Sequence, residues 1–142
     1  MYYITDGNGN RVPAQEGGNL AKAGIITEAT ALRVEDSGSE FILSAAAGAA
    51  ITLPSVLSSW KFKFRVGLAF DTTDWTIVSA TNVIQGYASV NYATIAAEDE
   101  NTISFVATAE TVGDWVEVVC DGTSIHAYGS GNSAGSITFT AP

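Results

Sequence analysis

The feature that most constrains the fold is a strict alternation of residue types between positions 60 and 66. The even positions are large and apolar, namely Trp60, Phe62, Phe64 and Val66, and the odd positions are basic, namely Lys61, Lys63 and Arg65. Successive side chains of a β-strand point to opposite faces, so this spacing places every apolar group on one face, whereas a helix would scatter them. The segment is predicted to be a strand that buries an aromatic face in a core.

From Ile25 onward the chain consists of short runs rich in Ile, Val, Thr, Phe and Trp, separated by Gly, Asn, Asp and Ser. Such runs are typical of strands joined by turns. Further strands are expected at 25–34, 41–44, 50–53, 75–80, 83–88, 102–108, 115–120, 124–128 and 136–140. The predicted fold class is all-β, as an antiparallel β-sandwich or a jelly-roll-like barrel.

The clearest turn signal is Asp121-Gly122, which stands between two of these runs. Asp-Gly is favoured in two-residue hairpin turns because it tolerates the positive φ angles that these turns require. Residues 115–120 and 123–128 are therefore predicted to pair as a hairpin.

Residues 1–24 have a different texture, with Gly-rich and Asn-rich stretches, Pro13 and few large apolar groups. They offer little to a core, so they are predicted to form an extended N-terminal arm before a β-sandwich domain at 25–142. The first residues lack a basic region followed by an apolar stretch, so no secretory signal is predicted and synthesis in the cytoplasm is expected.

The protein is acidic, with a formal net charge of −9. Nucleic-acid binding depends mainly on clustered Lys and Arg, so nucleic acid is not an expected partner. Residues 41–60, 75–97 and 122–142 carry no charge, but they are rich in Ser, Thr, Asn, Gly and Ala. None of them is predicted to be a membrane helix.

Reactive side chains are few, because the chain has one histidine and one cysteine. His126 is expected to be a surface or interface side chain, and Cys120 a buried thiol within an apolar run. A small jelly-roll hydrolase or lyase would need a metal or paired carboxylates, and zinc sites need several Cys or His ligands at set spacings. We therefore expect no enzyme activity, no cofactor and no metal site.

Oxygen-rich segments are the remaining candidates for a cation site. Asp6, Asn8 and Asn10 match the first three ligand positions of a calcium loop, but the glycine and glutamate positions of that loop do not match. A polar turn is the favoured interpretation. The acidic residues at 71–74 and 98–100 are expected to be solvated carboxylates in turns.

Three of the six basic residues, Lys61, Lys63 and Arg65, line one face of the predicted aromatic strand. Two interpretations are open. The charges could protect an edge strand from aggregation, or they could form a docking face for an acidic surface such as a capsid lattice.

Several segments together resemble a β-module that is frequent in virion structural proteins of tailed phages, including head decoration proteins and tail or head fibres. These segments are 50–55, 60–66, 76–77, 84–86 and 113–123. The resemblance covers about residues 30–142, and the Gly113-Asp114-Trp115 hairpin is its most specific part. After Asp-Gly-Thr the family pattern usually has another aromatic residue, where this chain has Ile125 and His126.

The resemblance implies a protein on the outside of a phage capsid, often a homotrimer, with the major capsid protein as its partner and no catalytic residues. In such proteins an N-terminal arm can add a strand to the shell. The candidate capsid-docking residues are Ile4 and Val12 in the arm and Lys61, Lys63 and Arg65 in the domain.

The alternative is a phage fibre or receptor-binding module that recognises host surface glycans. Tyr87, Tyr92 and Tyr128 would then contact the glycan. Fibre proteins usually carry this module at the end of a much longer chain, which favours decoration for a chain of 142 residues.

Overall fold

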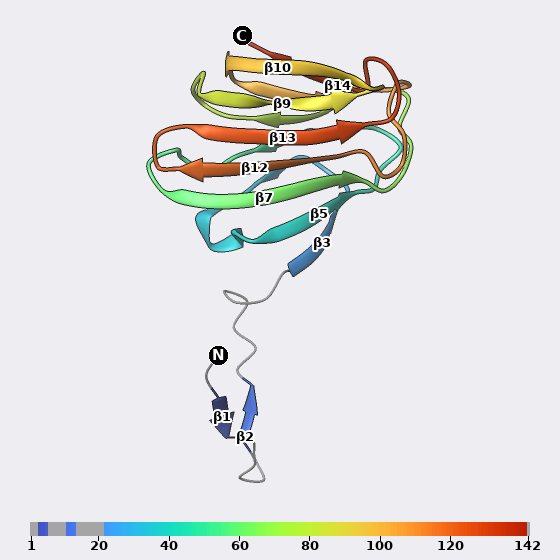
Figure 1. The fold of residues 1–142 in the computed structure, drawn as a ribbon. Coiled ribbons are helices and arrows are strands. Elements are labelled where there is room, and N and C mark those ends of the chain that lie inside the picture. The colour runs from blue at the N-terminus through green and yellow to red at the C-terminus, as the bar shows by residue number, and fades with distance from the viewer. Residues whose placement is uncertain (1–2, 6–10, 14–21, 142) are drawn as a thin grey trace.

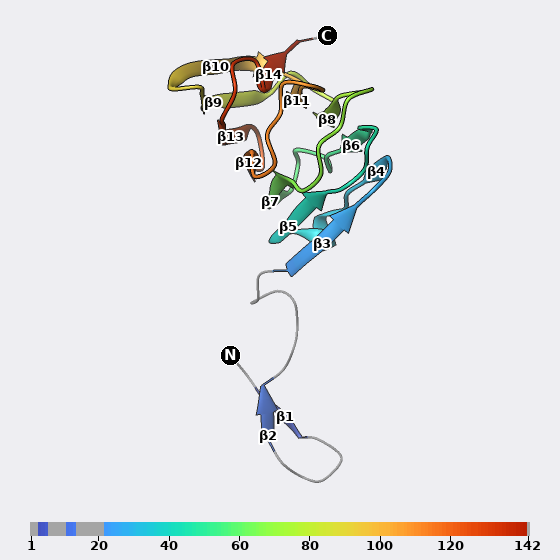
Figure 2. The ribbon, with the colours of Figure 1, turned by 90° about the vertical axis from the view of Figure 1, so that its right-hand side faces the viewer.

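The computed structural model describes residues 3–5, 11–13 and 22–141, and it shows a sandwich of two β-sheets (Figures 1 and 2). The larger sheet contains, in spatial order, β10 (Ala93–Glu100), β9 (Ile84–Val90), β13 (Ile125–Gly131), β12 (Trp115–Asp121), β7 (Ser59–Val66), β5 (Ser39–Leu43) and β3 (Lys22–Ile26). The smaller sheet contains β14 (Ile137–Thr140), β11 (Thr102–Phe105), β8 (Trp75–Val78), β6 (Ala50–Thr52) and β4 (Thr30–Ala31). The predicted all-β sandwich is confirmed.

Strand pairing is mixed, whereas the sequence predicted antiparallel sheets. From β3 to β8, successive strands alternate between the two sheets, so neighbours within one sheet run in the same direction. The second half of the larger sheet is built mainly from antiparallel pairs, with one parallel pair between β13 and β9. The relative direction of neighbouring strands is therefore set by connections that cross between the two sheets, and not by hairpins alone.

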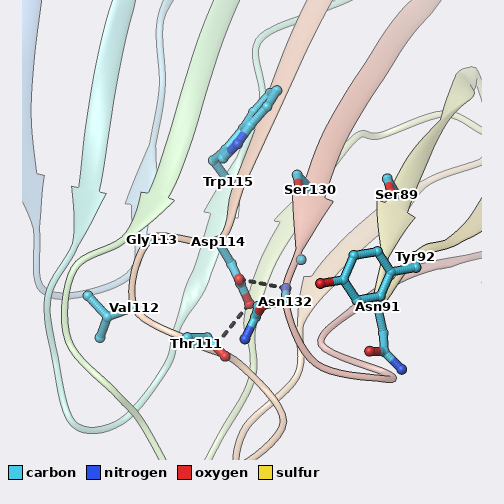
Figure 3. A pocket seen from close by; sticks show the side chains of 11 residues that line it. Ser89, Asn91, Tyr92, Thr111, Val112, Gly113, Asp114, Trp115, Ser130 and Asn132 are labelled. Carbon is cyan, nitrogen blue, oxygen red and sulfur yellow. Dashed lines mark hydrogen bonds between the residues drawn. The ribbon is translucent and has the colours of Figure 1, made fainter.

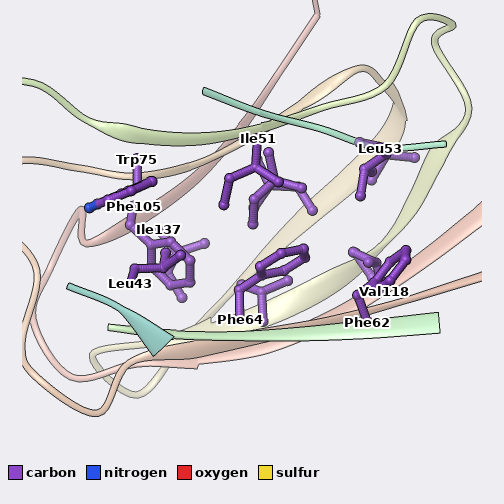
Figure 4. Close-up of a cluster of buried hydrophobic side chains, with 14 of the residues drawn as sticks. Leu43, Ile51, Leu53, Phe62, Phe64, Trp75, Phe105, Val118 and Ile137 are labelled. Atoms are coloured by element: carbon purple, nitrogen blue, oxygen red, sulfur yellow. The ribbon is translucent and has the colours of Figure 1, made fainter. Parts of the chain in front are cut away.

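The core lies between the two sheets, and β7 supplies its largest continuous apolar surface. Trp60, Phe62, Phe64 and Val66 are all buried in this core, as predicted from their alternation. Figure 4 shows Phe62 and Phe64 on the side of the core that faces Ile51 and Leu53. Burying one such side chain contributes about 1.5–3 kcal/mol relative to leaving it exposed. Cys120 is also buried, as expected.

Two parts of the strand prediction need correction. Residues 25–34 form parts of β3 and β4, which lie in different sheets, and a 3-10 turn begins at Val34. Strand β10 was not predicted, because its Ala-rich and acidic sequence has low β-propensity. Residues 98–100 belong to this strand and not to a turn, and Asp99 has a positive φ at an irregularity in its pairing.

The predicted hairpin is confirmed as β12 and β13, but its turn is shifted by one residue. The Asp121 N–H donates to the Ser124 carbonyl, so Gly122 and Thr123 are the central residues. Only Gly122 of these two has a positive φ, which suits the first central position of a hairpin turn.

Strand β7 lies between β12 and β5, in the interior of the larger sheet. The edge-strand interpretation of its three basic residues is therefore wrong, because both backbone edges of β7 are already paired.

Strands β1 (Tyr3–Thr5) and β2 (Arg11–Pro13) pair antiparallel as a two-stranded sheet, in which Ile4 is opposite Val12. The calcium-like fragment at residues 6–10 lies outside the described residues. Strand β3 begins at Lys22, within the range predicted for the arm. Among the described residues, no helix is long and apolar enough to cross a bilayer.

Candidate ligand-binding face

The outer face of the larger sheet carries side chains in straight rows that run across the strands. One row consists of Tyr87, Tyr128, Glu117, Lys63 and Glu40, which are register partners on β9, β13, β12, β7 and β5. Directly opposed side chains of neighbouring strands are close enough to contact one another. The next row places Trp115 beside Ser130.

Three aromatic rings meet on this face, and we call Trp115, Tyr128 and Tyr87 the aromatic cluster. The Tyr87 and Tyr128 ring centroids are 5.1 Å apart, and the Trp115 and Tyr128 centroids are 5.4 Å apart, both in edge-to-face geometry. Such pairs contribute about 0.5–1.5 kcal/mol beyond the area they bury. The two tyrosines nevertheless keep 49% and 48% of their surface exposed.

The basic residues of β7 lie beside this cluster. The Lys63 ammonium is 4.5 Å from the centre of the Trp115 ring, and both Lys63 and Arg65 form ion pairs with Glu40, at 4.0 and 3.2 Å. Arg65 also donates to the Gly113 carbonyl at 3.2 Å. Within the described part of the chain, the exposed Lys61 side chain forms no ion pair. The positive charge expected on this face is therefore partly neutralised by Glu40.

An open cleft of about 430 Å³ adjoins the aromatic cluster at one end of the sheet. Its lining comes from the ends of β9, β12 and β13, from the β9–β10 turn and from the loop before β12 (Figure 3). In this view Ser130 lies between Trp115 on one side and Ser89 and Tyr92 on the other. Asn91 and Asn132 add exposed amide side chains.

The contacts of Asp114 show why the sequence Gly113-Asp114-Trp115 suits the loop that leads into β12. Its carboxylate is buried and accepts hydrogen bonds from the backbone N–H groups of Thr111 and Asn132, at 2.9 and 3.0 Å. It thereby ties the loop before β12 to the end of β13. Gly113 has a φ of 103°, which favours glycine, and Trp115 begins β12 with its ring on the outer face.

His126 lies exposed on the same face, where its Nε2 is 2.9 Å from the Asp121 carboxylate. Asp121 also accepts hydrogen bonds from the Ser124 and Thr123 backbone N–H groups, both at 2.8 Å. The bond from Ser124, followed by those from His126 and Thr123, lowers the pKa of Asp121 to about 2. This carboxylate therefore stabilises the β12–β13 turn.

The acidic residues expected in turns have separate roles. Asp74 accepts a hydrogen bond from the Ala107 N–H at 2.8 Å, Asp71 accepts one from Thr72, and Asp99 accepts one from the Gln85 amide. Across residues 22–141 and the two short arm strands, no group of three or more His, Cys, Asp or Glu side chains is placed to hold a metal ion.

The sequence predicted part of this face. It singled out Tyr87, Tyr128 and Tyr92, and the structure brings the first two into contact and places Tyr92 in the adjoining cleft. Trp115 was placed at the start of the predicted strand 115–120, and no face was assigned to its ring, which lies on the outer face. The alternation of Trp115 with the buried Val116 could have shown this.

The predicted docking residues are divided between two parts of the chain. Lys61, Lys63 and Arg65 share the outer face of β7, whereas Ile4 and Val12 are opposed in the β1–β2 sheet. Their role in docking remains a prediction.

No protein-family model, no curated protein and no solved structure matches the chain.

Replacing Asp114 with Asn tests the role of its buried carboxylate. An amide presents only one oxygen, so one of the two backbone N–H groups would lose its acceptor, at a cost of about 1–3 kcal/mol. Urea unfolding should show this loss for Asp114→Asn and almost none for the matched change Asp71→Asn, whose carboxylate is exposed. Equal stability of the two variants would refute the structural role of Asp114.

The pKa of Asp121 predicts how the β12–β13 turn responds to acid. A carboxyl whose pKa is lower in the folded state than its ordinary value of 3.8 stabilises the fold above pH 4, and this contribution is lost as the pH falls through about 2. An NMR titration should place the Asp121 pKa near 2, and the Asp121→Asn variant should lack this part of the acid dependence. A titration midpoint near 3.8 would contradict the hydrogen-bonding arrangement.

Proposed function

We propose that the protein is a structural component of a tailed-phage virion that decorates the outside of the capsid as a homotrimer. The observation that carries this proposal is the resemblance of residues 30–142 to the β-module of phage head and fibre proteins. The segments that carry the resemblance lie in β6, β7, β8, β9 and the β12–β13 hairpin of one sandwich.

The geometry of the Gly113-Asp114-Trp115 sequence, which leads into β12, supports using this motif as a marker. The buried Asp114 carboxylate binds two backbone N–H groups, and Gly113 has a φ of 103°. The motif therefore has local structural requirements, and a shared motif favours a shared local fold. The proposal that this protein belongs to a virion is based on the frequency of the module in phage structural proteins.

Attachment to the shell is proposed to involve the N-terminal arm. Strands β1 and β2 form a sheet of their own among the described residues, and neither belongs to the sheets of the sandwich. A short strand pair of this kind can add to an exposed sheet edge through main-chain hydrogen bonds. Ile4 and Val12 remain the proposed apolar contacts.

The basic strip formed by Lys61, Lys63 and Arg65 is a weaker candidate for attachment than the sequence suggested. Two of its three charges are paired with Glu40, so docking on an acidic surface would depend mainly on Lys61.

The direct test is to mix the purified protein with undecorated capsids of the virus that encodes it and to image the particles by electron microscopy. Added density at three-fold positions is expected. Light scattering should give a mass near three times 14.7 kDa, about 44 kDa. Full-length protein that leaves the capsids bare would overturn the proposal.

A truncated protein tests the arm separately. Removing residues 1–21 keeps β3 intact from Lys22, so the sandwich should unfold at the same temperature but should no longer attach to capsids. The Lys61→Glu variant is the matched test of charge-based docking and should still attach. If the truncated protein saturates the particles, attachment does not depend on the arm.

A further inference from the structure

The aromatic cluster leaves apolar surface exposed on a face that the core does not need. Tyr87 and Tyr128 are each about half exposed, at 49% and 48%, although their neighbours Ala88 and Ala127 are buried on the opposite face. Aromatic side chains on a strand stabilise a protein most when they are buried. Their position on the outer face therefore leaves about half of each ring available to a ligand.

The edge-to-face contacts fix these rings in place. Tyr128 touches both Trp115 and Tyr87, and the Lys63 ammonium lies over the Trp115 ring. The strands that carry these rings, β9, β13 and β12, are each hydrogen-bonded to a neighbouring strand on both sides. A ligand would meet a largely preorganised surface, which lowers the entropy cost of binding.

The adjoining cleft adds hydrogen-bonding groups that carry no net charge. Ser89, Asn91, Ser130 and Asn132 are uncharged donors and acceptors at its wall. Asp114 is the only Asp, Glu, Lys, Arg or His residue in the lining, and its buried carboxylate already accepts two backbone hydrogen bonds. The polar part of the cleft thus favours a neutral ligand with many hydroxyl or amide groups.

Tyr92 is the second observation that points to a ligand. It is fully exposed and has a φ of 64°, next to Asn91 with a φ of 49°, in the turn between β9 and β10. Turns with two positive φ angles favour Asn and Gly, and a bulky residue at such a position is uncommon. An exposed aromatic ring held at a strained position beside a cleft suggests a binding role.

We propose that this face binds a neutral saccharide. Sugar rings combine hydroxyl groups with patches of C–H bonds, and these patches pack on the electron-rich faces of aromatic rings. Trp115, Tyr128 and Tyr87 would contact the C–H patches, and the cleft amides and hydroxyls would bond the sugar hydroxyls. The cleft volume of about 430 Å³ is near the small end of the roughly 300–1,000 Å³ typical of ligand sites, which suits one or two sugar units.

This inference goes beyond capsid decoration, because it assigns a ligand to the sandwich and not to the arm. Single-stranded nucleic acid also stacks on aromatic rings, but it needs a positively charged groove for its phosphates. Here Lys63 and Arg65 are paired with Glu40 and the net charge is −9. A second copy of the chain is the other partner that this aromatic face could bind, and the experiment below distinguishes it from a saccharide.

The test screens the full-length protein against a printed array of neutral oligosaccharides built from hexoses and N-acetylhexosamines, with sialylated and sulfated glycans for comparison. The strongest neutral binder is then measured by calorimetry. Trp115→Ala and Tyr128→Ala should each weaken its binding at least tenfold. Leu57→Ala, which removes an exposed apolar side chain outside the face, should leave binding unchanged.

Thermal unfolding of each variant shows whether it is folded. The Trp115→Phe variant should retain much of the affinity, because it keeps an aromatic ring that can pack against the sugar. The proposal is overturned if no neutral oligosaccharide binds at millimolar concentration, or if only charged glycans bind. It is also overturned if Trp115→Ala and Tyr128→Ala convert an oligomer to a monomer, because the cluster is then an interface between copies. Capsid attachment that survives in Trp115→Ala keeps the proposed function separate from this result.

Discussion

The fold depends on one constraint, namely that the strands of the first half cross from one sheet to the other at every step. From β3 to β8 the chain alternates between the two sheets, so each strand has one face toward the shared core. The inner face of β7 meets this requirement with four consecutive inward-facing apolar residues. The same crossing makes β3, β5 and β7 parallel neighbours, which hairpins alone could not produce.

Because the inner faces supply the core, the outer face of the larger sheet is available for other chemistry. Its rows juxtapose aromatic rings with a charged group formed by Glu40, Lys63 and Arg65. Asp114 fixes the loop at the end of these rows, and Asp121 fixes the turn at the opposite end of β12. Rigid strands and hydrogen-bonded turns therefore position the same set of side chains that we propose to meet a ligand.

The sequence predicted what depends on local pattern. Alternation identified β7 and its buried face, and Asp121-Gly122 identified the β12–β13 hairpin, although the turn lies one residue later. The fold class followed from the repeated short runs. These features could be predicted because a strand's pleat and a turn's φ angles depend on residues close in sequence.

Features that depend on distant parts of the chain could not be predicted. Whether β7 is an edge or a central strand depends on β12 and β5, and the contact of Tyr87 with Tyr128 depends on the parallel pairing of β9 with β13. Strand β10 has a sequence of low β-propensity, and its hydrogen bonds to β9 override that preference.

The central claim is that the two faces of the larger sheet have separate roles, one in folding and one in binding. Denaturant unfolding of Phe64→Ala and Tyr128→Ala tests it most directly, because these aromatic residues lie on opposite faces of the same sheet. A loss of about 3–5 kcal/mol is expected for the buried Phe64, and a smaller loss of about 1–2 kcal/mol for the half-exposed Tyr128, which makes two ring pairs. Equal losses for the two variants would contradict it, since both faces would then support the fold.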